Sequence, residues 1–364
     1  MLLKTKKIIL DEYDKKSSLY LAYGQKLESL VQEILQDSEV VVHSVSFRRK
    51  ERYSLEKKLS KQDVNYKELS DITDICGLRV ITYFDDEVKI FSKILEKEFQ
   101  IDSLNSSDKS ESLDPDRFGY LSVHYIVSNG EERNNLAEYK RYAGIKAEIQ
   151  VRSILQHAWA EIEHDLGYKS SQGIPRPVRR RFSRLAGLLE LADQEFRTIR
   201  EELSSYSEEV LDNIENSPSI IELNSISLKA LINTSDLINK IDKKIAVAGK
   251  CKLEDDLGDD YSQEVKRLTF FGMNTIEDIS NSLAKNEVTI LKFADVWLND
   301  GQIEDDVGWF TRGVSLFYLG YVLAAQSKDL KKMTQYAESF ITTDSKEESE
   351  KLVQDLVEKY ESLI

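Results

Sequence analysis

The hydrophobic pattern of this chain changes character partway along its length, and that change constrains the fold more than any other feature. Short apolar runs rich in β-branched residues interrupt the first half, so strands are expected over residues 40–45, 78–83, 121–127 and 145–151. Helical spacing predicts helices over residues 11–37, 88–99, 153–167 and 176–213. A few strands interleaved with helices predict an α+β domain with a mixed β-sheet flanked by helices.

A segment rich in Ser and Asn surrounds Pro218. After it, the apolar residues recur only at the spacing of helices. Six further helices are expected, over residues 228–246, 261–284, 287–299, 309–327, 329–341 and 345–363. We therefore expect a first domain over residues 1–213, a linker over 214–227, and an all-helical domain over 228–364.

The net charge of −15 is distributed unevenly. Residues 1–200 contain as many basic as acidic side chains, whereas residues 201–364 hold all of the excess negative charge. Two domains with different roles would explain this split, and so would acidic helices that only keep the protein in solution. The chain lacks a long uncharged apolar run and an N-terminal secretion signal, and it has only 2 Cys, so a cytoplasmic location without membrane contact is expected.

A first cluster of polar residues suits a polyphosphate. Arg48 and Lys50 flank a strand end, and Ser54 and Lys58 share one face of the helix that follows. Several cations and a hydroxyl that converge on one point would bind phosphate groups. Such runs are more often solvated surface, so this cluster alone is a weak signal.

Two further clusters lie on buried strands. Asp74 precedes the strand that contains Gly77 and Arg79, where a carboxylate could hold Mg²⁺ and a guanidinium could stack on a base. Glu148, Gln150 and Arg152 share one face of another strand, which packing alone does not explain. Asp74 could instead cap a turn and Arg79 could face solvent.

Two weaker signals remain in the first domain. Tyr120, at the edge between a loop and a strand, could stack on a nucleobase or be an ordinary edge tyrosine. His157, Glu161 and His164 lie on one helix at a spacing that a zinc site can use. Orientation of neighbouring site residues, or helix packing, explains the second group better.

Taken in order, these clusters resemble the synthetase domain of the RelA/SpoT family over about residues 20–200. The matching positions are Arg48, Lys50, Ser54, Lys58, Asp74, Gly77, Arg79, Gly119, Tyr120, Ser122, His124, Glu148, Gln150, Arg152, Trp159, Glu163, His164, Tyr168 and Lys169. The resemblance implies an ATP-dependent enzyme that transfers the β,γ-diphosphate to a ribose 3′-hydroxyl. It is similar to the small, synthetase-only members.

The resemblance also implies roles for single residues. Arg48 and Arg79 would sandwich the adenine of ATP, and its phosphates would be held by Lys50, Ser54 and Lys58. Asp74 and Glu148 would bind Mg²⁺, with Glu148 also activating the 3′-hydroxyl. The acceptor would contact Tyr120, Ser122, His124, Gln150 and Arg152.

This chain differs from the alarmone-making members of the family in the segment that recognises the acceptor. The stretch from Ser112 to Phe118 lacks the Tyr-Ile and Pro-Lys that usually help to read a guanine nucleotide. The chain looks more like the toxic small alarmone synthetases, of which the fused CapRel type carries its own antitoxin and modifies the 3′ end of tRNA. Arg176, Arg180 and Arg184 form a basic helical stripe that suits tRNA phosphates, or that pairs with the acidic domain.

The resemblance gives the acidic domain a possible inhibitory role. Tyr318 and Tyr321 would cover the ATP site in a CapRel-like protein, although aromatic residues at this spacing also pack helical cores. Residues 265–284 resemble a helix-turn-helix, but the acidic charge makes DNA binding an unsuitable function.

The main hypothesis is a self-inhibited toxin that diphosphorylates tRNA and is released by a trigger such as a phage protein. The alternatives are a (p)ppGpp synthetase that uses GDP or GTP, and a domain that only binds nucleotides or RNA. Retention of Asp74 and Glu148 argues against the last of these.

Overall fold

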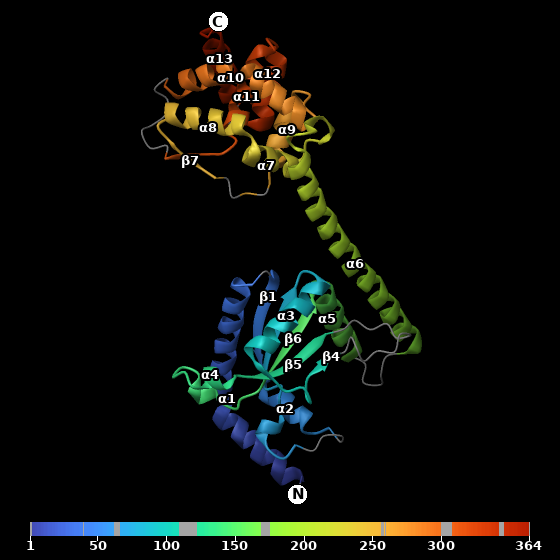
Figure 1. Ribbon diagram of the computed structural model, residues 1–364. Coiled ribbons are helices and arrows are strands. Elements are labelled where there is room, and N and C mark those ends of the chain that lie inside the picture. Colours follow the sequence, from blue (N-terminus) through green and yellow to red (C-terminus); the bar gives the residue numbers. More distant parts are fainter. Residues whose placement is uncertain are drawn as a thin grey trace. The chain divides into compact units, whose positions relative to one another are not determined.

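The structure, a computed structural model, describes residues 2–38, 40–61, 66–108, 122–168, 175–255, 258, 260–299, 308–341 and 346–363. The chain divides into two compact units, Met1–Glu201 and Glu202–Ile364 (Figure 1). The division falls inside one long helix, α6 (Arg176–Asn213), and not at its end, where the sequence placed the end of the first domain.

The first unit is built on a mixed sheet, which confirms the predicted α+β class. Its strands are β1 (Val42–Arg49), β2 (Cys76–Thr82), β3 (Gln100–Ile101), β4 (Ser107–Asp108), β5 (Val123–Ser128) and β6 (Ala147–Ser153). They follow the order β1-β2-β6-β5-β3, and β4 pairs with β5. The neighbours β2 and β6 are parallel, whereas the other pairs are antiparallel.

Helices and short turns complete this unit: α1 (Leu2–Gln36), α2 (Arg52–Lys58), η1 (Leu69–Asp71), α3 (Asp85–Glu98), α4 (Glu131–Asn134), η2 (Lys140–Tyr142) and α5 (Ile154–Tyr168). The apolar faces of α1 and α3 pack with the apolar face of the sheet in one core, which includes Leu27, Phe91 and Ile149. A side chain on Gly24 would begin 1.8 Å from the ring of Phe47, so the glycine lets α1 lie directly against β1.

The second unit is largely helical. Its helices are η3 (Pro218–Ile220), α7 (Ser225–Thr234), α8 (Asp236–Ala248), α9 (Ser262–Phe270), α10 (Ile276–Leu298), α11 (Val314–Gln326), α12 (Leu330–Phe340) and α13 (Lys346–Glu361). The prediction of an all-helical domain is corrected by β7 (Lys252–Glu254) and β8 (Trp309–Thr311), which form a parallel pair. Three-residue strands are too short to produce a recognisable alternation.

Residues 214–227, which the sequence suggested as a linker, differ from that expectation. Ile214 and Ile221 are buried in the core of the second unit, and Glu222 forms a β-bridge with Thr275. The polar residues that looked like a linker instead make caps, since the Asn224 side chain accepts a hydrogen bond from the Ser227 backbone at the start of α7.

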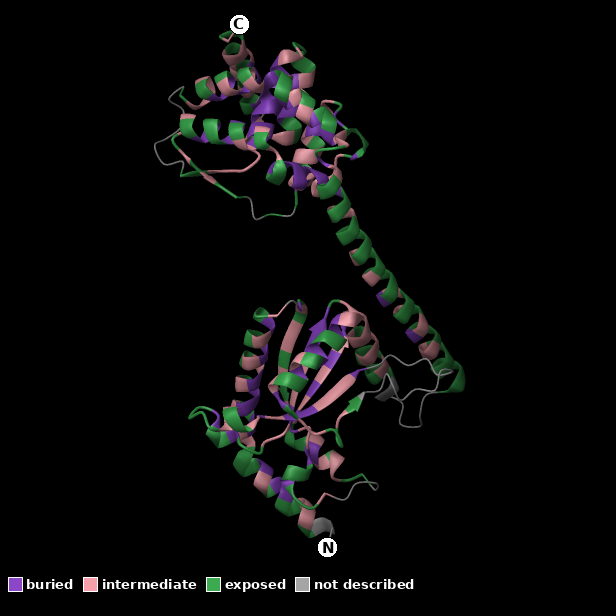
Figure 2. Cartoon of the chain, in the orientation of Figure 1, coloured by how far each residue is buried: buried purple, intermediate pink, exposed green. Residues whose placement is uncertain are grey.

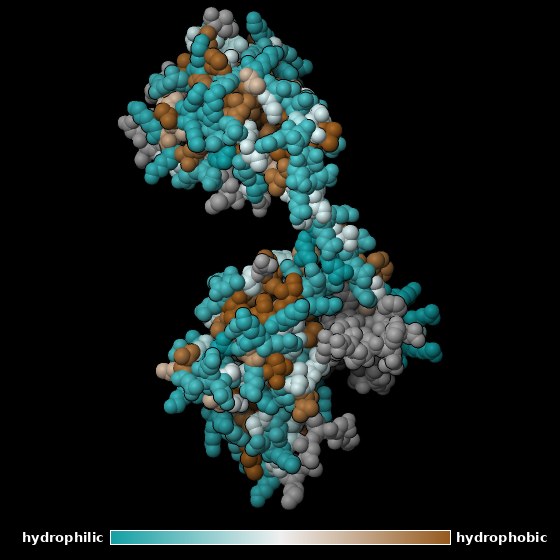
Figure 3. Space-filling view, viewed as in Figure 1, coloured by the Kyte–Doolittle hydropathy of each residue, from teal (hydrophilic) through white to brown (hydrophobic). Residues whose placement is uncertain are grey.

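The surface of the second unit is mainly hydrophilic. Hydrophilic residues cover most of the face seen in Figure 3. Gly272, with a φ of +84°, lies in the turn between α9 and α10, so two helices joined by a turn span residues 265–284. In the described ranges, no helix is both long and apolar enough to cross a membrane.

Candidate active site

One face of the sheet in the first unit is polar across three neighbouring strands. Along β6 the side chains of Glu148, Gln150 and Arg152 alternate with fully buried residues, as the sequence predicts. Gly77 and Arg79 of β2 pair in register with Glu148 and Gln150. A pocket of about 250 Å³ opens on this face, lined by Arg48, Lys50, Asp74, Gly77, Leu78, Arg79, Glu148 and Gln150.

Arg48 and Lys50 flank the end of β1, as expected, and Arg48 reaches this pocket from the strand itself. β1 continues to Arg49, and Arg48 pairs with Gly77 while Ser46 pairs with Arg79. Arg48 and Arg79 therefore lie diagonally on neighbouring strands. Gly77 between them has no side chain, which leaves the floor of the pocket open.

The carboxylate of Asp74 is the centre of a charge cluster. Its Oδ2 atom accepts from Lys58 Nζ at 2.8 Å and from Lys50 Nζ at 2.9 Å. Burial raises the pKa of Asp74, but the hydrogen bond from Lys58 and the charge of Lys50 outweigh it, so the pKa lies below its ordinary value. The Tyr66 ring lies 5.7 Å from Lys58 Nζ. Nothing in the sequence pattern pointed to Tyr66.

Glu148 belongs to a second hydrogen-bonded group. Its Oε1 atom lies 2.8 Å from His124 Nδ1, and its Oε2 atom accepts from Gln150 Nε2 at 2.9 Å. The other ring nitrogen of His124 lies 2.6 Å from Ser122 Oγ. Burial raises the pKa of Glu148, but the hydrogen bond and charge of His124 lower it by more, so Glu148 is ionised at neutral pH.

The donor set fits Mg²⁺. Asp74 Oδ1 is buried and has no hydrogen-bond partner within the described part of the chain, so it offers a lone pair to a cation. The negative charge of Asp74 raises the pKa of Glu148, which indicates that the two carboxylates are close enough to interact. Mg²⁺ prefers one or two carboxylates together with phosphate oxygens as ligands. The site offers two neighbouring carboxylates and leaves space for phosphate oxygens.

Helix α5 contributes a contact that supports the site. Glu161 forms an ion pair of 3.1 Å with Arg79. For His157, Glu161 and His164, the sequence left open a zinc site or the orientation of neighbouring site residues. The ion pair of Glu161 with Arg79 is of the second kind. Among residues that the structure describes, no group of three His, Cys, Asp or Glu could hold a metal ion.

Arg152 and His157 interact electrostatically with this pair. Arg152 Nε and His157 Nδ1 are buried without hydrogen-bond partners in the described ranges. Burial lowers the pKa of Arg152, and the charge of Arg79 lowers it further. Burial also lowers the pKa of His157, and the charge of Glu161 opposes this shift.

The remaining predicted residues lie in different places. Ser54 is half-buried on α2, one turn before Lys58. Tyr120 lies outside the described residues. Arg176, Arg180 and Arg184 are exposed at the start of α6.

Tyr318 and Tyr321 lie in the core of the second unit, where they are only 3% and 4% exposed. Packing in a helical core, the alternative to covering the ATP site, therefore explains the positions of both tyrosine rings. Either tyrosine could cover a nucleotide site only if this core opened.

Comparison with known proteins agrees with the resemblance of the motifs. Residues 47–173 match the family model described as a region found in RelA / SpoT proteins. The chain is 28% identical over 173 residues to the GTP pyrophosphokinase YjbM of Bacillus subtilis, which covers 46% of this chain and 76% of the relative. It is 27% identical over 142 residues to the GTP pyrophosphokinase YwaC of the same organism, with coverages of 39% and 64%.

Solved structures include the small alarmone synthetase 1 of Bacillus subtilis bound to its product pppGpp. That protein is 25% identical, with a TM-score of 0.45, and the match covers 53% of this chain and 99% of the other. The same protein bound to AMPCPP matches with 24% identity and a TM-score of 0.41, over 53% of this chain and 98% of the other.

Proposed function

We propose that the chain is a pyrophosphokinase with a RelA/SpoT-like synthetase domain followed by a further helical region, and that it transfers diphosphate from ATP to the ribose 3′-hydroxyl of GDP or GTP. The observation that carries this proposal is the pocket itself. Arg48, Lys50, Arg79, Asp74 and Glu148 line one cavity, so cations, a metal-binding carboxylate pair and an ionised glutamate meet there.

The reaction balances as a single displacement at phosphorus. The acceptor 3′-oxygen bonds to the β-phosphorus of ATP, and the bond between that phosphorus and the oxygen bridging to the α-phosphate breaks. AMP leaves, and the acceptor hydroxyl loses one proton. Such transfers are catalysed mainly by positioning and charge neutralisation, which matches a pocket made of fixed charges.

In this proposal, ATP is bound by Arg79 and by the residues of the first cluster. Arg48 and Arg79 project from neighbouring strands on the same sheet face, which supports their stacking on the two sides of an adenine. Lys50 and Lys58 would move from Asp74 to the phosphates, with Ser54 beside them. When bound at Asp74 and Glu148, Mg²⁺ would supply further neutralisation of phosphate charge.

Glu148 and His124 would act on the acceptor. An ionised Glu148 can accept the proton of the 3′-hydroxyl, and the hydrogen bonds from His124 and Gln150 hold its carboxylate in one orientation. Arg152 follows Gln150 by two residues on the same face of β6, and its Nε donor has no partner within the described residues, so it suits a phosphate of the acceptor. Tyr120 keeps its proposed role in stacking on the acceptor base.

The identity of the acceptor is the main choice within this proposal. The curated relatives are named GTP pyrophosphokinases, which favours the guanine nucleotide over tRNA. One observation favours tRNA as a second candidate. Arg176, Arg180 and Arg184 are exposed and lie four residues apart on α6, where they could contact a nucleic-acid backbone.

One labelling experiment separates these candidates. The full-length chain is incubated with Mg²⁺ and ATP labelled in the γ-phosphate, and with GDP, GTP or bulk tRNA as acceptor. We expect label in the guanine nucleotide and none in reactions of Glu148→Ala. Label in tRNA alone, lost in a variant with Arg176, Arg180 and Arg184 changed to Ala, would replace GDP and GTP with tRNA as the acceptor. No transfer to any acceptor would contradict the proposal.

Self-inhibition by the second unit is a separate part of the toxin hypothesis. The concentration of negative charge in residues 201–364 supports it, because an acidic body tethered to a basic site has a high effective concentration there. A chain that ends at Glu201, shown to be folded by circular dichroism, should then be more toxic to cells than the full chain. Equal growth with both would remove both the inhibitory role and the need for a phage trigger.

A further inference from the structure

A second cavity opens in the first unit, and none of the functions above uses it. Its volume is about 210 Å³. The described residues that line it come from α1, from η1 with the residue that follows, and from the segment 141–146, which leads from η2 into β6. It shares no described lining residue with the active-site pocket. We call it the α1 cavity.

Much of the lining of the α1 cavity is apolar. It includes Leu19, Tyr20, Ile72 and Ile145. Tyr20 and Ile72 are only 8% and 3% exposed, because they also belong to the core in which α1 packs on the sheet. Figure 2 shows buried and exposed residues interspersed along α1. Burial raises the pKa of Tyr20 to about 12, so this part of the wall carries no charge at neutral pH.

The remaining polar side chains of the lining are cationic or neutral. Lys16 comes from α1, and Arg141 and Lys146 come from the segment before β6. Ser70 adds a hydroxyl group, and no described carboxylate lines the cavity. The active-site pocket differs in this respect, because two carboxylates lie among its cations. The α1 cavity therefore suits an anion and offers no carboxylate to a metal ion.

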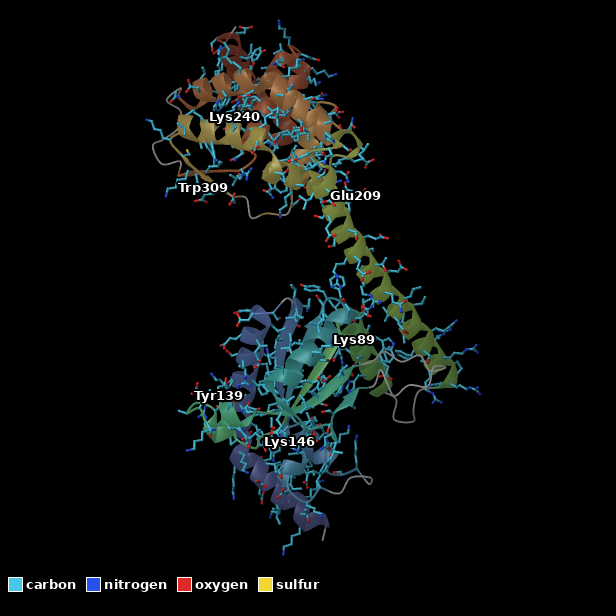
Figure 4. All side chains as sticks on the ribbon, in the orientation of Figure 1. Lys89, Tyr139, Lys146, Glu209, Lys240 and Trp309 are labelled. Atoms are coloured by element: carbon cyan, nitrogen blue, oxygen red, sulfur yellow. The ribbon has the colours of Figure 1, made fainter. Side chains whose placement is uncertain are left out.

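Carboxylates outside the cavity hold its two lysines in position. Lys16 Nζ lies 2.7 Å from Glu12 Oε1, and Lys146 Nζ lies 2.6 Å from Asp102 Oδ2. An ammonium group has three N–H donors, so each lysine keeps donors for an anion while one is used by its carboxylate. Figure 4 labels Lys146, which directly precedes the start of β6.

Arg141 is the cation of the three whose charge is compensated least. In the described ranges its guanidinium lies 4.7 Å from the centre of the Tyr142 ring and donates to the hydroxyl group of the same residue, rather than to a carboxylate. The side chain of Arg141 is exposed. A guanidinium has five N–H donors in a planar fork, which can bind two oxygens of one anion at once. Arg141 is therefore the main anion-binding group of the α1 cavity.

The volume and the charge restrict the ligand. About 210 Å³ is less than the range of about 300–1,000 Å³ that is usual for pockets of drug-sized ligands, so the ligand is compact. A phosphate monoester carries a charge of about −1.5 to −2 at pH 7 and has three strong acceptor oxygens. Three cations match such a group better than they match the single charge of a carboxylate.

We propose that the α1 cavity binds a small organic phosphate monoester. Its phosphate group contacts Arg141, Lys16 and Lys146, and its apolar body lies against Tyr20 and Ile72. The apolar part of the lining distinguishes this site from a solvated group of surface lysines, because it gives the organic part of the ligand a place to bury its surface.

The α1 cavity adjoins the segments that lead to both carboxylates of the active-site pocket. Ile72 precedes Asp74 by two residues, and Lys146 precedes Glu148 by two residues. Both carboxylates line the separate pocket, however, so a ligand of the α1 cavity should bind without the groups assigned to ATP. The proposed site is thus independent of the proposed diphosphate transfer.

Titration calorimetry of the full-length chain with phenyl phosphate tests the ligand class. Phenyl phosphate combines a phosphate monoester with one apolar ring. We expect it to bind at least tenfold more tightly than inorganic phosphate, which lacks the ring, and than benzoate, which carries a carboxylate. Equal affinity for inorganic phosphate or for benzoate would overturn the proposed ligand class, and no binding of phenyl phosphate would overturn the site.

Variants locate the site. Arg141→Gln and Lys16→Gln should each weaken the binding of phenyl phosphate about tenfold, since each removes a charge-assisted hydrogen bond. Both side chains are exposed, so the variants should fold, which circular dichroism would check. The matched control is Lys89→Gln on α3, which removes another exposed charge, labelled in Figure 4. Arg48→Gln, in the active-site pocket, should also leave the affinity unchanged. Binding that is lost in Arg48→Gln and retained in Arg141→Gln would place phenyl phosphate in the active-site pocket and overturn the proposal.

Discussion

The carboxylate of Asp74 lies 2.8 Å from the ammonium group of Lys58, and Lys50 approaches the same oxygen. The cations assigned to ATP phosphates are thus held, before ATP binds, by the carboxylate assigned to Mg²⁺. When Mg²⁺ binds Asp74, the two lysines would leave that carboxylate and bind the phosphates of ATP instead. In this arrangement one carboxylate partly offsets the charges of two lysines in a partly buried site.

The first prediction concerns this exchange. Asp74→Asn should lower the rate of diphosphate transfer by about a hundredfold or more, because it removes a metal ligand and leaves the two lysines without their partner. Steady-state kinetics with ATP and GTP would measure it. The matched control is Glu56→Gln on α2, which should retain near wild-type rates. A rate for Asp74→Asn close to that of the control would refute the assignment.

The second prediction concerns pH. The hydrogen bond and charge of His124 lower the pKa of Glu148. His124→Ala should therefore raise that pKa, and the acidic limb of the pH–rate profile should move to higher pH. The exposed His43 provides a control, since His43→Ala should leave the limb in place. An unmoved limb in both variants would show that Glu148 does not govern activity at low pH.

The same two carboxyls affect stability. Asp74 and Glu148 have pKa values below those of an unfolded chain. Such groups stabilise the fold at pH values above the unfolded pKa, and the contribution is lost as the pH falls through the folded pKa. We expect the first unit to lose stability below about pH 4.5, the ordinary pKa of a glutamate. Chemical denaturation at a series of pH values, followed by near-ultraviolet circular dichroism, would detect the loss. In Asp74→Asn/Glu148→Gln the same decline should be shallower.

The third prediction concerns the second unit, where Asp242 of α8 is fully buried against the start of α11. Its two oxygens accept from the backbone N–H groups of Gly313 at 2.7 Å and Ser315 at 2.8 Å. Asp242→Ala would leave both donors buried without acceptors, at a cost of about 1–3 kcal/mol each. Urea denaturation would measure it, with Asp295→Ala at an exposed position as the control. A change of a few tenths of a kcal/mol would contradict this role.

The fourth prediction separates packing from inhibition at Tyr321. Its ring centroid lies 4.5 Å from that of Phe317 and 4.9 Å from that of Trp297. Tyr321→Ala should lower the free energy of unfolding by about 3–5 kcal/mol, as for other large core residues. Leu330→Ala, at a position 65% exposed, should cost far less. If Tyr321→Ala instead kept full stability and increased transfer activity, covering of the ATP site would be the better explanation.

The strand pattern of the first unit was predictable because one face is buried and the other is polar. Glu148, Gln150 and Arg152 were recognisable as one face of a strand from their spacing alone. The pairing of Arg79 with Glu161 could not be derived in this way, because the two residues are 82 positions apart and meet only through the packing of α5. The convergence of Lys50 and Lys58 on one oxygen atom likewise depends on tertiary structure.

Helix boundaries in the second unit were missed for local reasons. The helix expected over residues 228–246 is two helices, because Ser235 caps the start of α8 and breaks the run. The break expected near residue 285 is absent, since Asn286 continues α10 and accepts a hydrogen bond of 2.8 Å from Gln326. A polar residue inside a helix resembles a helix end in sequence, and only its tertiary partner distinguishes the two.

The parallel pairing of β2 with β6 also bears on how the protein acquires its activity as it folds. Asp74 and Glu148 are brought together by two strands whose paired residues are 71 positions apart, from Cys76 and Ala147 to Thr82 and Ser153. Closing such a long loop has a large entropic cost, and contacts of this range slow folding. The antiparallel contacts between β5 and β6 span less of the chain. During refolding, far-ultraviolet signals from local helices should therefore recover before the protein binds ATP, and nucleotide binding would report the arrival of β6 beside β2.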